Sequence, residues 1–268
     1  MAEAMLTDRS VVIIGGTAGL GLSAALACLQ AGARVIVTAR PGKDHSEAAG
    51  LLGVHGRILE ADSRDPASAV AAIEAAVEFT GRCDALYHVA GGSGRSWGDG
   101  PLHEITDDGW RETLNQNLTS LMNSSRAAVR HFLSRKQRGT ILAMTSVLGA
   151  SPSPKYFATH AYAAAKSAVS GFVKACAAYY APMDIRFNAV APGLVATPMA
   201  HRAMGDEAIL RFIKTKQPLD GGRIGVASDL DGAAVFFLSD ASKFVTGQVL
   251  AIDGGWSVCE GQYEPVGD

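Results

Sequence analysis

The sequence predicts a single doubly wound α/β domain, in which helices cover both faces of a parallel sheet. Short β-branched runs alternate with longer Ala-rich runs, and no Pro/Gly/Ser-rich linker divides the 268 residues. Such regular alternation implies right-handed crossovers and parallel strands. Because 48 % of the residues are hydrophobic, the chain can bury a large core. We therefore expect one domain over residues 1–268, with its core over about 10–256 and a C-terminal tail over 257–268.

The expected elements follow one another in strand–helix order. Strands are expected over residues 10–14, 34–38, 57–61, 84–89, 140–145, 185–190 and 248–252. Helices are expected over residues 20–31, 65–79, 107–136 (as one or two helices), about 160–180 and 228–239. Asp65 is a suitable N-cap for its helix, with Pro66 at the first helical position. Sheets of this kind bind ligands beyond the carboxyl ends of their strands, so we expect the site in the loops there.

Composition excludes several classes of protein. The net charge of −2 gives no basic surface for nucleic acid, and no apolar run approaches the ~18 residues of a membrane span. The first ten residues do not resemble a secretory signal. Four scattered cysteines fit a reducing compartment, and seven dispersed histidines show no metal-ligand spacing. We expect a cytoplasmic protein that binds a small molecule and no metal, nucleic acid or membrane.

A glycine-rich loop, Gly15-Gly-Thr-Ala-Gly-Leu-Gly21, directly follows the first expected strand. Glycines at such a turn let the backbone approach a pyrophosphate, and the next helix offers free N–H groups. The ATPase phosphate loop is excluded because Leu22 stands where that loop needs a lysine. The spacing Gly19-x-Gly21-x-x-Ala24 matches the general dinucleotide fingerprint, and the alternative is a tight turn that binds no ligand.

Further motifs occur in the expected loops. In chain order they are Gly15-x-x-x-Gly19-x-Gly21, Asp62, Ala90-Gly91, Asn117, Ser146, Tyr162-x-x-x-Lys166, Pro192-Gly193 with Thr197, Gly222-Arg-Ile-Gly225 and Asp253-Gly-Gly-Trp256. Together they resemble the short-chain dehydrogenase/reductase family over about residues 10–256. The resemblance implies a Rossmann-type domain with a seven-stranded sheet, a nicotinamide cofactor and a homotetramer or homodimer. The Ala-rich helix 161–178 and Trp256 are expected to pack against other subunits.

Tyr162 and Lys166 are four residues apart and share one face of a helix. A lysine ammonium beside a tyrosine favours the phenolate, so we expect the pKa of Tyr162 to fall from near ~10 toward the working pH. The resemblance implies that Tyr162 protonates a carbonyl oxygen, Ser146 hydrogen-bonds that oxygen, Lys166 holds the ribose and Asn117 anchors a water. Ser146 does not fit a hydrolase nucleophile, since neither position 144 nor position 148 is glycine.

The resemblance also implies a set of cofactor-binding residues. They are Gly15, Thr17, Gly19, Leu20, Gly21, Arg40, Asp62, Ser63, Ala90, Gly91, Tyr162, Lys166, Pro192, Gly193, Val195 and Thr197. NAD-preferring relatives carry an acid at the end of the second strand, where this chain reads Ala39-Arg40. A guanidinium can pair with a 2′-phosphate, so NADP(H) is favoured, with NAD(H) as the alternative.

Two departures from the family pattern affect the site. His88-Val89 replaces paired asparagines, and we expect His88 to be a hydrogen-bonded core residue. The segment from Ser146 to Tyr162 is longer than usual, with extra residues in 150–160.

The loops expected around the substrate are largely apolar. They carry Arg95 and Trp97, then Tyr156 and Phe157, and then Met204, Leu210, Phe212 and Ile213 within residues 199–221. The predicted function is NADP(H)-dependent interconversion of a ketone and a secondary alcohol. The alternatives are an NAD-dependent alcohol dehydrogenase and a non-catalytic cofactor-binding regulator. An isomerase or dehydratase is disfavoured because the chain has no large C-terminal substrate domain.

Overall fold

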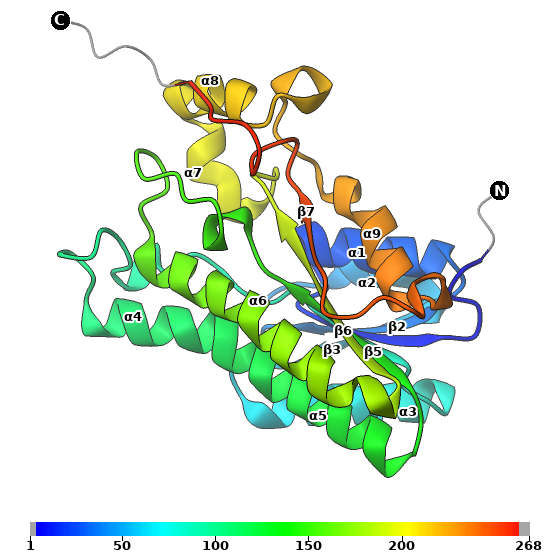
Figure 1. The fold of residues 1–268 in the computed structure, drawn as a ribbon. Helices are drawn as coiled ribbons and strands as arrows, with labels where there is room; N and C mark the ends of the chain where they lie inside the picture. The colour runs from blue at the N-terminus through cyan, green and yellow to red at the C-terminus, as the bar shows by residue number, and fades with distance from the viewer. Residues whose placement is uncertain (1–3, 263–268) are drawn as a thin grey trace, which may run out of the picture.

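The computed structural model describes residues 4–262 and contains one seven-stranded parallel sheet in the order β3-β2-β1-β4-β5-β6-β7 (Figure 1). The strands are β1 (Ser10–Ile14), β2 (Arg34–Ala39), β3 (Gly56–Glu60), β4 (Ala85–His88), β5 (Gly139–Met144), β6 (Ile185–Pro192) and β7 (Val249–Ile252). All seven expected strands are confirmed, with each end within two residues of its expected position. The predicted doubly wound fold is therefore confirmed.

Most helices of the described chain form layers on both faces of this sheet, whereas those within residues 201–216 lie beyond its edge (Figure 1). The helices are α1 (Gly19–Gln30), α2 (Ser46–Leu52), α3 (Pro66–Thr80), α4 (Asp107–Leu114), α5 (Ser120–Ser134), α6 (His160–Tyr180), α7 (His201–Met204), α8 (Glu207–Lys216) and α9 (Asp231–Leu238). Asp65 caps α3 as expected, with its side chain accepting a hydrogen bond from the backbone N–H of Ala67 at 2.9 Å.

Alternate residues of each strand divide the core between the two faces. Val12 and Ile14 pack with α3, α5 and α6, whereas Val11 and Ile13 pack with α1 and α9. All five residues of β1 are buried, as expected for a parallel sheet covered on both sides. The register pairs Ile14 with Thr38 on one side and with His88 on the other. The loops that follow these strands are thereby brought to one edge of the sheet.

Three helices, α2, α7 and α8, were not expected from the sequence. The clearest signal lies in α8, where Asp206 accepts hydrogen bonds from the N–H groups of Ala208 and Ile209. Buried Ile209 and Ile213 then recur at helical spacing on one face. The segment 199–221 is thus largely helical rather than an open loop. The last part of the expected tail, residues 263–268, lies outside the described residues.

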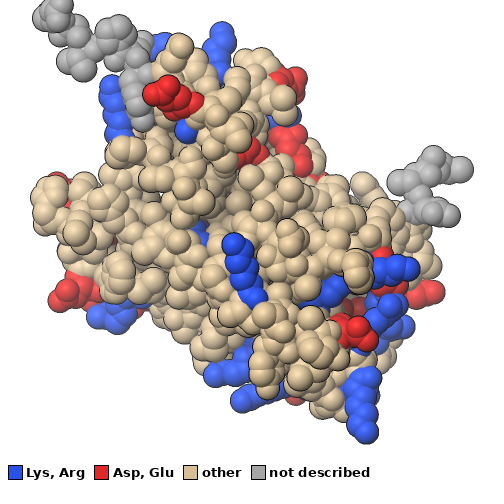
Figure 2. Space-filling model, in the orientation of Figure 1, with Lys and Arg blue, Asp and Glu red and all other residues tan. Residues whose placement is uncertain are grey.

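Between residues 4 and 262, no helix is long and apolar enough to cross a membrane. Figure 2 shows acidic and basic side chains scattered over the same face, with uncharged residues covering most of it.

Candidate active site

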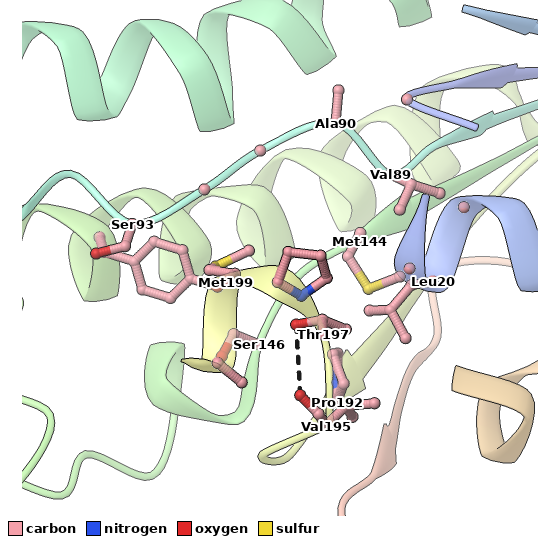
Figure 3. A pocket seen from close by; sticks show the side chains of 18 of the residues that line it. Leu20, Val89, Ala90, Ser93, Met144, Ser146, Pro192, Val195, Thr197 and Met199 are labelled. Atoms are coloured by element: carbon pink, nitrogen blue, oxygen red, sulfur yellow. Dashed lines mark hydrogen bonds between the residues drawn. The ribbon is translucent and has the colours of Figure 1, made fainter. Parts of the chain in front are cut away.

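A pocket of about 490 Å³ lies at the carboxyl edge of the sheet. Its walls come from the glycine loop after β1, residues 89–95 after β4, residues 144–148 after β5 and residues 192–203 after β6. Figure 3 shows Leu20 of the glycine loop at one end, and Ser93 and Ser146 toward the other. The pocket therefore joins most of the predicted cofactor residues with Ser146, Tyr162 and Lys166 in one space.

The glycine loop has the geometry that a phosphate-binding turn requires. Gly15 has a φ of +87°, and a Cβ there would lie 3.0 Å from the backbone of Ala90. A Cβ on Gly21 would collide with the carbonyl oxygen of Gly15. The N–H of Gly15 donates to Thr38 Oγ1 at 3.1 Å, which ties the loop to the end of β2.

Helix α1 begins at this loop with no side-chain cap from Ala18 and no acidic residue in its first turn. The first N–H groups and the positive end of the helix dipole are thus left for an anion. These residues fit a dinucleotide pyrophosphate.

Lys166 is buried beside the Tyr162 ring on α6. Its Nζ lies 5.6 Å from the ring centroid and donates a hydrogen bond to the carbonyl oxygen of Met144 at 2.9 Å. The side chain is only 3 % exposed, and this burial lowers the pKa of Lys166 to about 8. Tyr162 and Lys166 share a helix face as predicted.

The predicted fall in the pKa of Tyr162 is wrong for this structure. Burial raises the pKa of the phenol above its ordinary value, and the neighbouring Ser146 hydroxyl only partly offsets that rise. Desolvation disfavours the phenolate, so Tyr162 holds its proton at neutral pH. A protonated phenol is the form needed to donate a proton to a carbonyl oxygen.

Asp99 holds the start of the catalytic helix and was not predicted from the sequence. Its carboxylate accepts hydrogen bonds from the backbone N–H groups of Ala161 and Tyr162, both at 2.9 Å. Asp99 is 6 % exposed and belongs to the loop after β4. A carboxylate at a helix N-terminus satisfies free N–H groups and favours the helix dipole. No local sequence spacing could show this contact, because 62 residues separate Asp99 from Ala161.

Asn117 lies in a π-helical turn, Asn115–Thr119, between α4 and α5. Its side chain accepts a hydrogen bond from the N–H of Gly92 at 3.1 Å and donates to the Gly92 carbonyl at 2.9 Å. A Cβ on Gly91 would lie 2.7 Å from Asn117 Oδ1 and 3.3 Å from Lys166 Nζ. Asn117 thus fixes the loop after β4 beside Lys166, and π-turns of this kind are frequent at functional sites.

Most of the predicted site residues line the pocket. They are Gly15, Thr17, Gly19, Leu20, Gly21, Arg40, Ser63, Ala90, Gly91, Ser146, Tyr162, Lys166, Pro192, Gly193, Val195 and Thr197. Asn117 and Asp62 are not among the lining residues. Asp62 instead forms an ion pair with Arg64, with Oδ2 and Nη2 2.6 Å apart, while its neighbours Ala61 and Ser63 line the pocket.

The loop after β6 is held by Gln217, which was also not predicted from the sequence. Gln217 is 2 % exposed and clamps Leu194, accepting from its N–H at 2.5 Å and donating to its carbonyl at 3.2 Å. Thr197 Oγ1 donates to the Val195 carbonyl at 3.4 Å, as the dashed line in Figure 3 shows.

The apolar end of the pocket differs in part from the prediction. Phe157 and Met199 line it, but Tyr156, Trp97, Met204, Leu210, Phe212 and Ile213 do not. Phe212 and Ile213 instead pack with Trp256 in a buried cluster.

Trp256 also lines the pocket and is 1 % exposed within its own chain. Its Nε1 donates to the Ser151 carbonyl at 3.0 Å, and its ring lies 5.5 Å from that of Phe157. The expectation that Trp256 packs against another subunit is therefore wrong, because this chain already buries it.

His88 is the hydrogen-bonded core residue that the sequence analysis expected. It is 1 % exposed, and its ring nitrogens lie 2.8 Å from Ser124 Oγ and 3.2 Å from Ser120 Oγ. Burial lowers the pKa of His88 to about 3, helped by the charge of Lys166. The imidazole is therefore neutral at physiological pH.

Comparison with known proteins agrees with this geometry. A family model described as "Enoyl-(Acyl carrier protein) reductase" matches residues 15–257. The chain is 30 % identical to cis-4-hydroxycyclohexanecarboxylate dehydrogenase of Sinomonas cyclohexanicum, over 96 % of this chain and 99 % of that protein. It is 34 % identical to 2-dehydro-3-deoxy-D-gluconate 5-dehydrogenase of Bacillus subtilis, over 94 % and 95 % of the two chains.

A solved structure of a short-chain type dehydrogenase/reductase from Mycobacterium ulcerans superimposes with a TM-score of 0.87 at 27 % identity. The alignment covers 96 % of this chain and 92 % of that one. The chain carries the glycine loop and the Tyr162–Lys166 pair, and it matches these relatives over nearly their whole length. It therefore belongs to the short-chain dehydrogenase/reductase family and is an NAD(P)-dependent oxidoreductase of alcohols and ketones.

Proposed function

We propose that this protein is an NADP(H)-dependent oxidoreductase that interconverts a ketone and a secondary alcohol, with Tyr162 as general acid and base. One observation carries the proposal: Tyr162, Lys166 and Ser146 line the same pocket as the glycine loop. The names of the matched relatives, dehydrogenases of a hydroxycyclohexanecarboxylate and of a dehydro-deoxygluconate, support a small hydroxyl- or carbonyl-bearing substrate.

The chain's own groups supply proton transfer and charge stabilisation. A reduced nicotinamide, when bound, supplies the hydride. Tyr162 donates its proton to the substrate oxygen as that oxygen gains negative charge, and the Ser146 hydroxyl hydrogen-bonds the same oxygen. The ammonium of Lys166, 5.6 Å from the ring centroid, stabilises the phenolate that remains. Asn117 acts as a positioning residue, because its amide holds Gly92 in the loop beside Lys166.

Tyr162→Phe tests the catalytic assignment, since phenylalanine keeps the ring and deletes the proton donor. We expect at least a hundredfold loss of kcat, of the order that general acid–base catalysis contributes, with NADPH affinity changed by no more than a few-fold. Turnover is followed by NADPH absorbance over a panel of ketones. A variant that keeps more than about a tenth of the wild-type kcat would contradict the assignment. Tight NADPH binding by the wild type without turnover of any ketone would favour the regulator.

The preference for NADP(H) rests on Arg40, which directly follows β2 and lines the pocket. Arg40→Ala should lower kcat/KM with NADPH by about ten- to a hundredfold, because a charge-assisted hydrogen bond contributes ~1.5–3 kcal/mol. The kcat/KM of Arg40→Ala with NADH should change little. The double variant Ala39→Asp/Arg40→Ala should prefer NADH over NADPH, because it offers a carboxylate to the ribose hydroxyls. A wild-type enzyme that prefers NADH, or a double variant with unchanged preference, would show that Arg40 has no such role.

We further propose a cytoplasmic homo-oligomer, a tetramer or a dimer. All four cysteines are free thiols, which supports a reducing compartment. The exposed side of α6 carries a stripe of small residues that would allow close helix packing between subunits: Ala164, Ala168, Gly171, Ala175 and Ala178.

A further inference from the structure

The charged side chains that line the pocket are all basic. They are Arg40, Arg95, Lys166 and Arg202, and the lining drawn from residues 4–262 includes no aspartate or glutamate. Composition does not account for this, since acidic residues outnumber basic ones by 26 to 24 in the whole chain. A ligand with negative charge is therefore favoured throughout the pocket.

Two of these four cations already have a place in the proposed function. Arg40 lies beside the glycine loop at the end of β2, and Lys166 lies against Tyr162. Arg95 follows Ser93 by two positions, and Arg202 follows Met199 by three. In Figure 3, Ser93 and Met199 lie with Ser146 on the opposite side of the pocket from Leu20. Arg202 lies at the apolar end of the pocket, with its guanidinium 5.9 Å from the Phe157 ring centroid, and Arg95 lines the pocket from the same loop as Ser93.

Neither guanidinium is neutralised by the described chain. Arg95 and Arg202 are both solvent-exposed, and neither forms an ion pair with any carboxylate between residues 4 and 262. Arg202 uses one donor, from Nη2 to the Tyr156 carbonyl at 2.9 Å, and its guanidinium lies 5.9 Å from the Phe157 ring centroid. These two contacts hold Arg202 against the 150–160 segment and leave its other N–H groups free.

The two guanidiniums line the same pocket and act on each other electrostatically. Burial lowers the pKa of Arg95, and the positive charge of Arg202 lowers it further. Asp99 attracts Arg95, but its carboxylate oxygens accept hydrogen bonds from the N–H groups of Ala161 and Tyr162. Two neighbouring cations at a concave site are stabilised when an anion lies between them.

We propose that the substrate carries a carboxylate group away from its reacting carbonyl carbon, and that Arg95 and Arg202 bind this group. The inference rests on the proposed ketone–alcohol function. The planar fork of a guanidinium matches the two oxygens of a carboxylate, whereas a neutral ester or amide offers no charge to it. Phe157, Met199 and Trp256 contact the apolar part of the same molecule.

Matched substrates test the proposal directly. A series of straight-chain and cyclic keto acids, in which the ketone and the carboxylate are separated by an increasing number of carbon atoms, is reduced with NADPH. Each acid is paired with its primary amide, which has nearly the same shape and no charge. For the best acid we expect kcat/KM at least tenfold above that of its amide, because a hydrogen bond to a charged group contributes ~1.5–3 kcal/mol.

Substitutions identify the groups that recognise the charge. Arg95→Gln and Arg202→Gln should each lower the ratio of kcat/KM for acid over amide by about tenfold, and the double variant should abolish the preference. Arg→Lys at either position should keep part of it. Arg130→Gln is a matched control, since Arg130 is exposed on α5 and lies outside the pocket lining. A merely structural role would lower kcat/KM for acid and amide equally and leave the ratio unchanged.

Binding measured without turnover keeps this inference separate from the proposed function. Calorimetry with the Tyr162→Phe variant saturated with NADPH compares each keto acid with its amide. The proposal is supported if a keto acid binds more tightly than its amide and if Arg95→Gln/Arg202→Gln removes this preference, whether or not the wild type turns the acid over. Equal binding of acid and amide in every pair overturns it, even if neutral ketones are reduced and the oxidoreductase function stands.

Discussion

Lys166→Met should stabilise the protein near neutral pH, although Lys166 belongs to the proposed catalytic group. Lys166 is 3 % exposed, and its ammonium donates to the Met144 carbonyl at 2.9 Å and has no ion pair with a carboxylate in the described part of the chain. Burial lowers the pKa of Lys166 from 10.5 to about 8, which means that the folded protein holds this charge at a cost in free energy.

The magnitude follows from that pKa. A difference of one unit between the pKa values of Lys166 in the folded and the unfolded state corresponds to about 1.4 kcal/mol. The charged lysine therefore destabilises the fold by roughly 3 kcal/mol near pH 7. Methionine has a similar length and an apolar surface, and it loses one hydrogen bond worth about 1 kcal/mol. The variant should therefore be more stable than the wild type by about 2 kcal/mol near pH 7.

The sign of the pH dependence makes the reasoning testable. The unfolded chain keeps the Lys166 proton up to about pH 10.5, whereas the folded protein releases it from about pH 8, so wild-type stability rises over this window. In urea unfolding, the difference in free energy of unfolding between Lys166→Met and the wild type should shrink by about 2 kcal/mol between roughly pH 7 and pH 9.5. Lys174→Met, at an exposed position of the same helix, is the control and should show no such pH dependence. A variant less stable near neutral pH, or a difference independent of pH, would refute the reasoning.

Three further outcomes are expected. Burial lowers the pKa of His88 to about 3 in the folded protein, whereas the unfolded chain takes up this proton below about pH 6.5, so the free energy of unfolding of the wild type falls by about 1.4 kcal/mol per pH unit below that pH. Urea unfolding of His88→Asn between roughly pH 6 and pH 4 should show a shallower fall. Equal pH slopes for wild type and variant would contradict this. Asp99→Ala leaves the N–H groups of Ala161 and Tyr162 without their acceptor and should lower the free energy of unfolding in urea by about 1–2 kcal/mol and also lower kcat. Asp99→Asn should have intermediate stability and kcat. Unchanged stability in Asp99→Ala would argue against the helix cap. Gly171→Arg should leave the fold intact, because an added Cβ at Gly171 meets no atom within 4 Å. Light scattering should give a multiple of 27.8 kDa for the wild type and a lower mass for this variant. A wild-type mass near 27.8 kDa would show a monomer and contradict the proposed oligomer.

The strands and the cofactor loops could be predicted because their signals are local. β1 is buried along its whole length and reads as a continuous β-branched run. Gly15 and Gly21 occupy positions where a Cβ would meet neighbouring backbone, so the residue type follows from the backbone path. Lys166 shares a helix face with Tyr162, which a spacing of four residues predicts.

What could not be predicted depends on contacts between distant segments. Asp99 reaches the start of α6 across 62 residues, and Trp256 donates to Ser151 across 105. The pKa of Tyr162 differs from the prediction for the same reason: the spacing to Lys166 is visible in the sequence, but the burial that raises the pKa of the phenol is not. Desolvation depends on the packing around the whole side chain, which no local pattern encodes.

The two ends of the pocket are therefore subject to different constraints. At the cofactor end, substitution of Gly15 or Gly21 would force backbone apart, so that end can change little without loss of the fold. At the substrate end, Arg95 and Arg202 are exposed and can be replaced at small cost in stability. Behind them, Trp256 is buried against Phe157 and holds the wall in place. A change of substrate charge can thus arise at the two arginines alone, while the wall, the glycine loop and the Tyr162–Lys166 pair remain as they are.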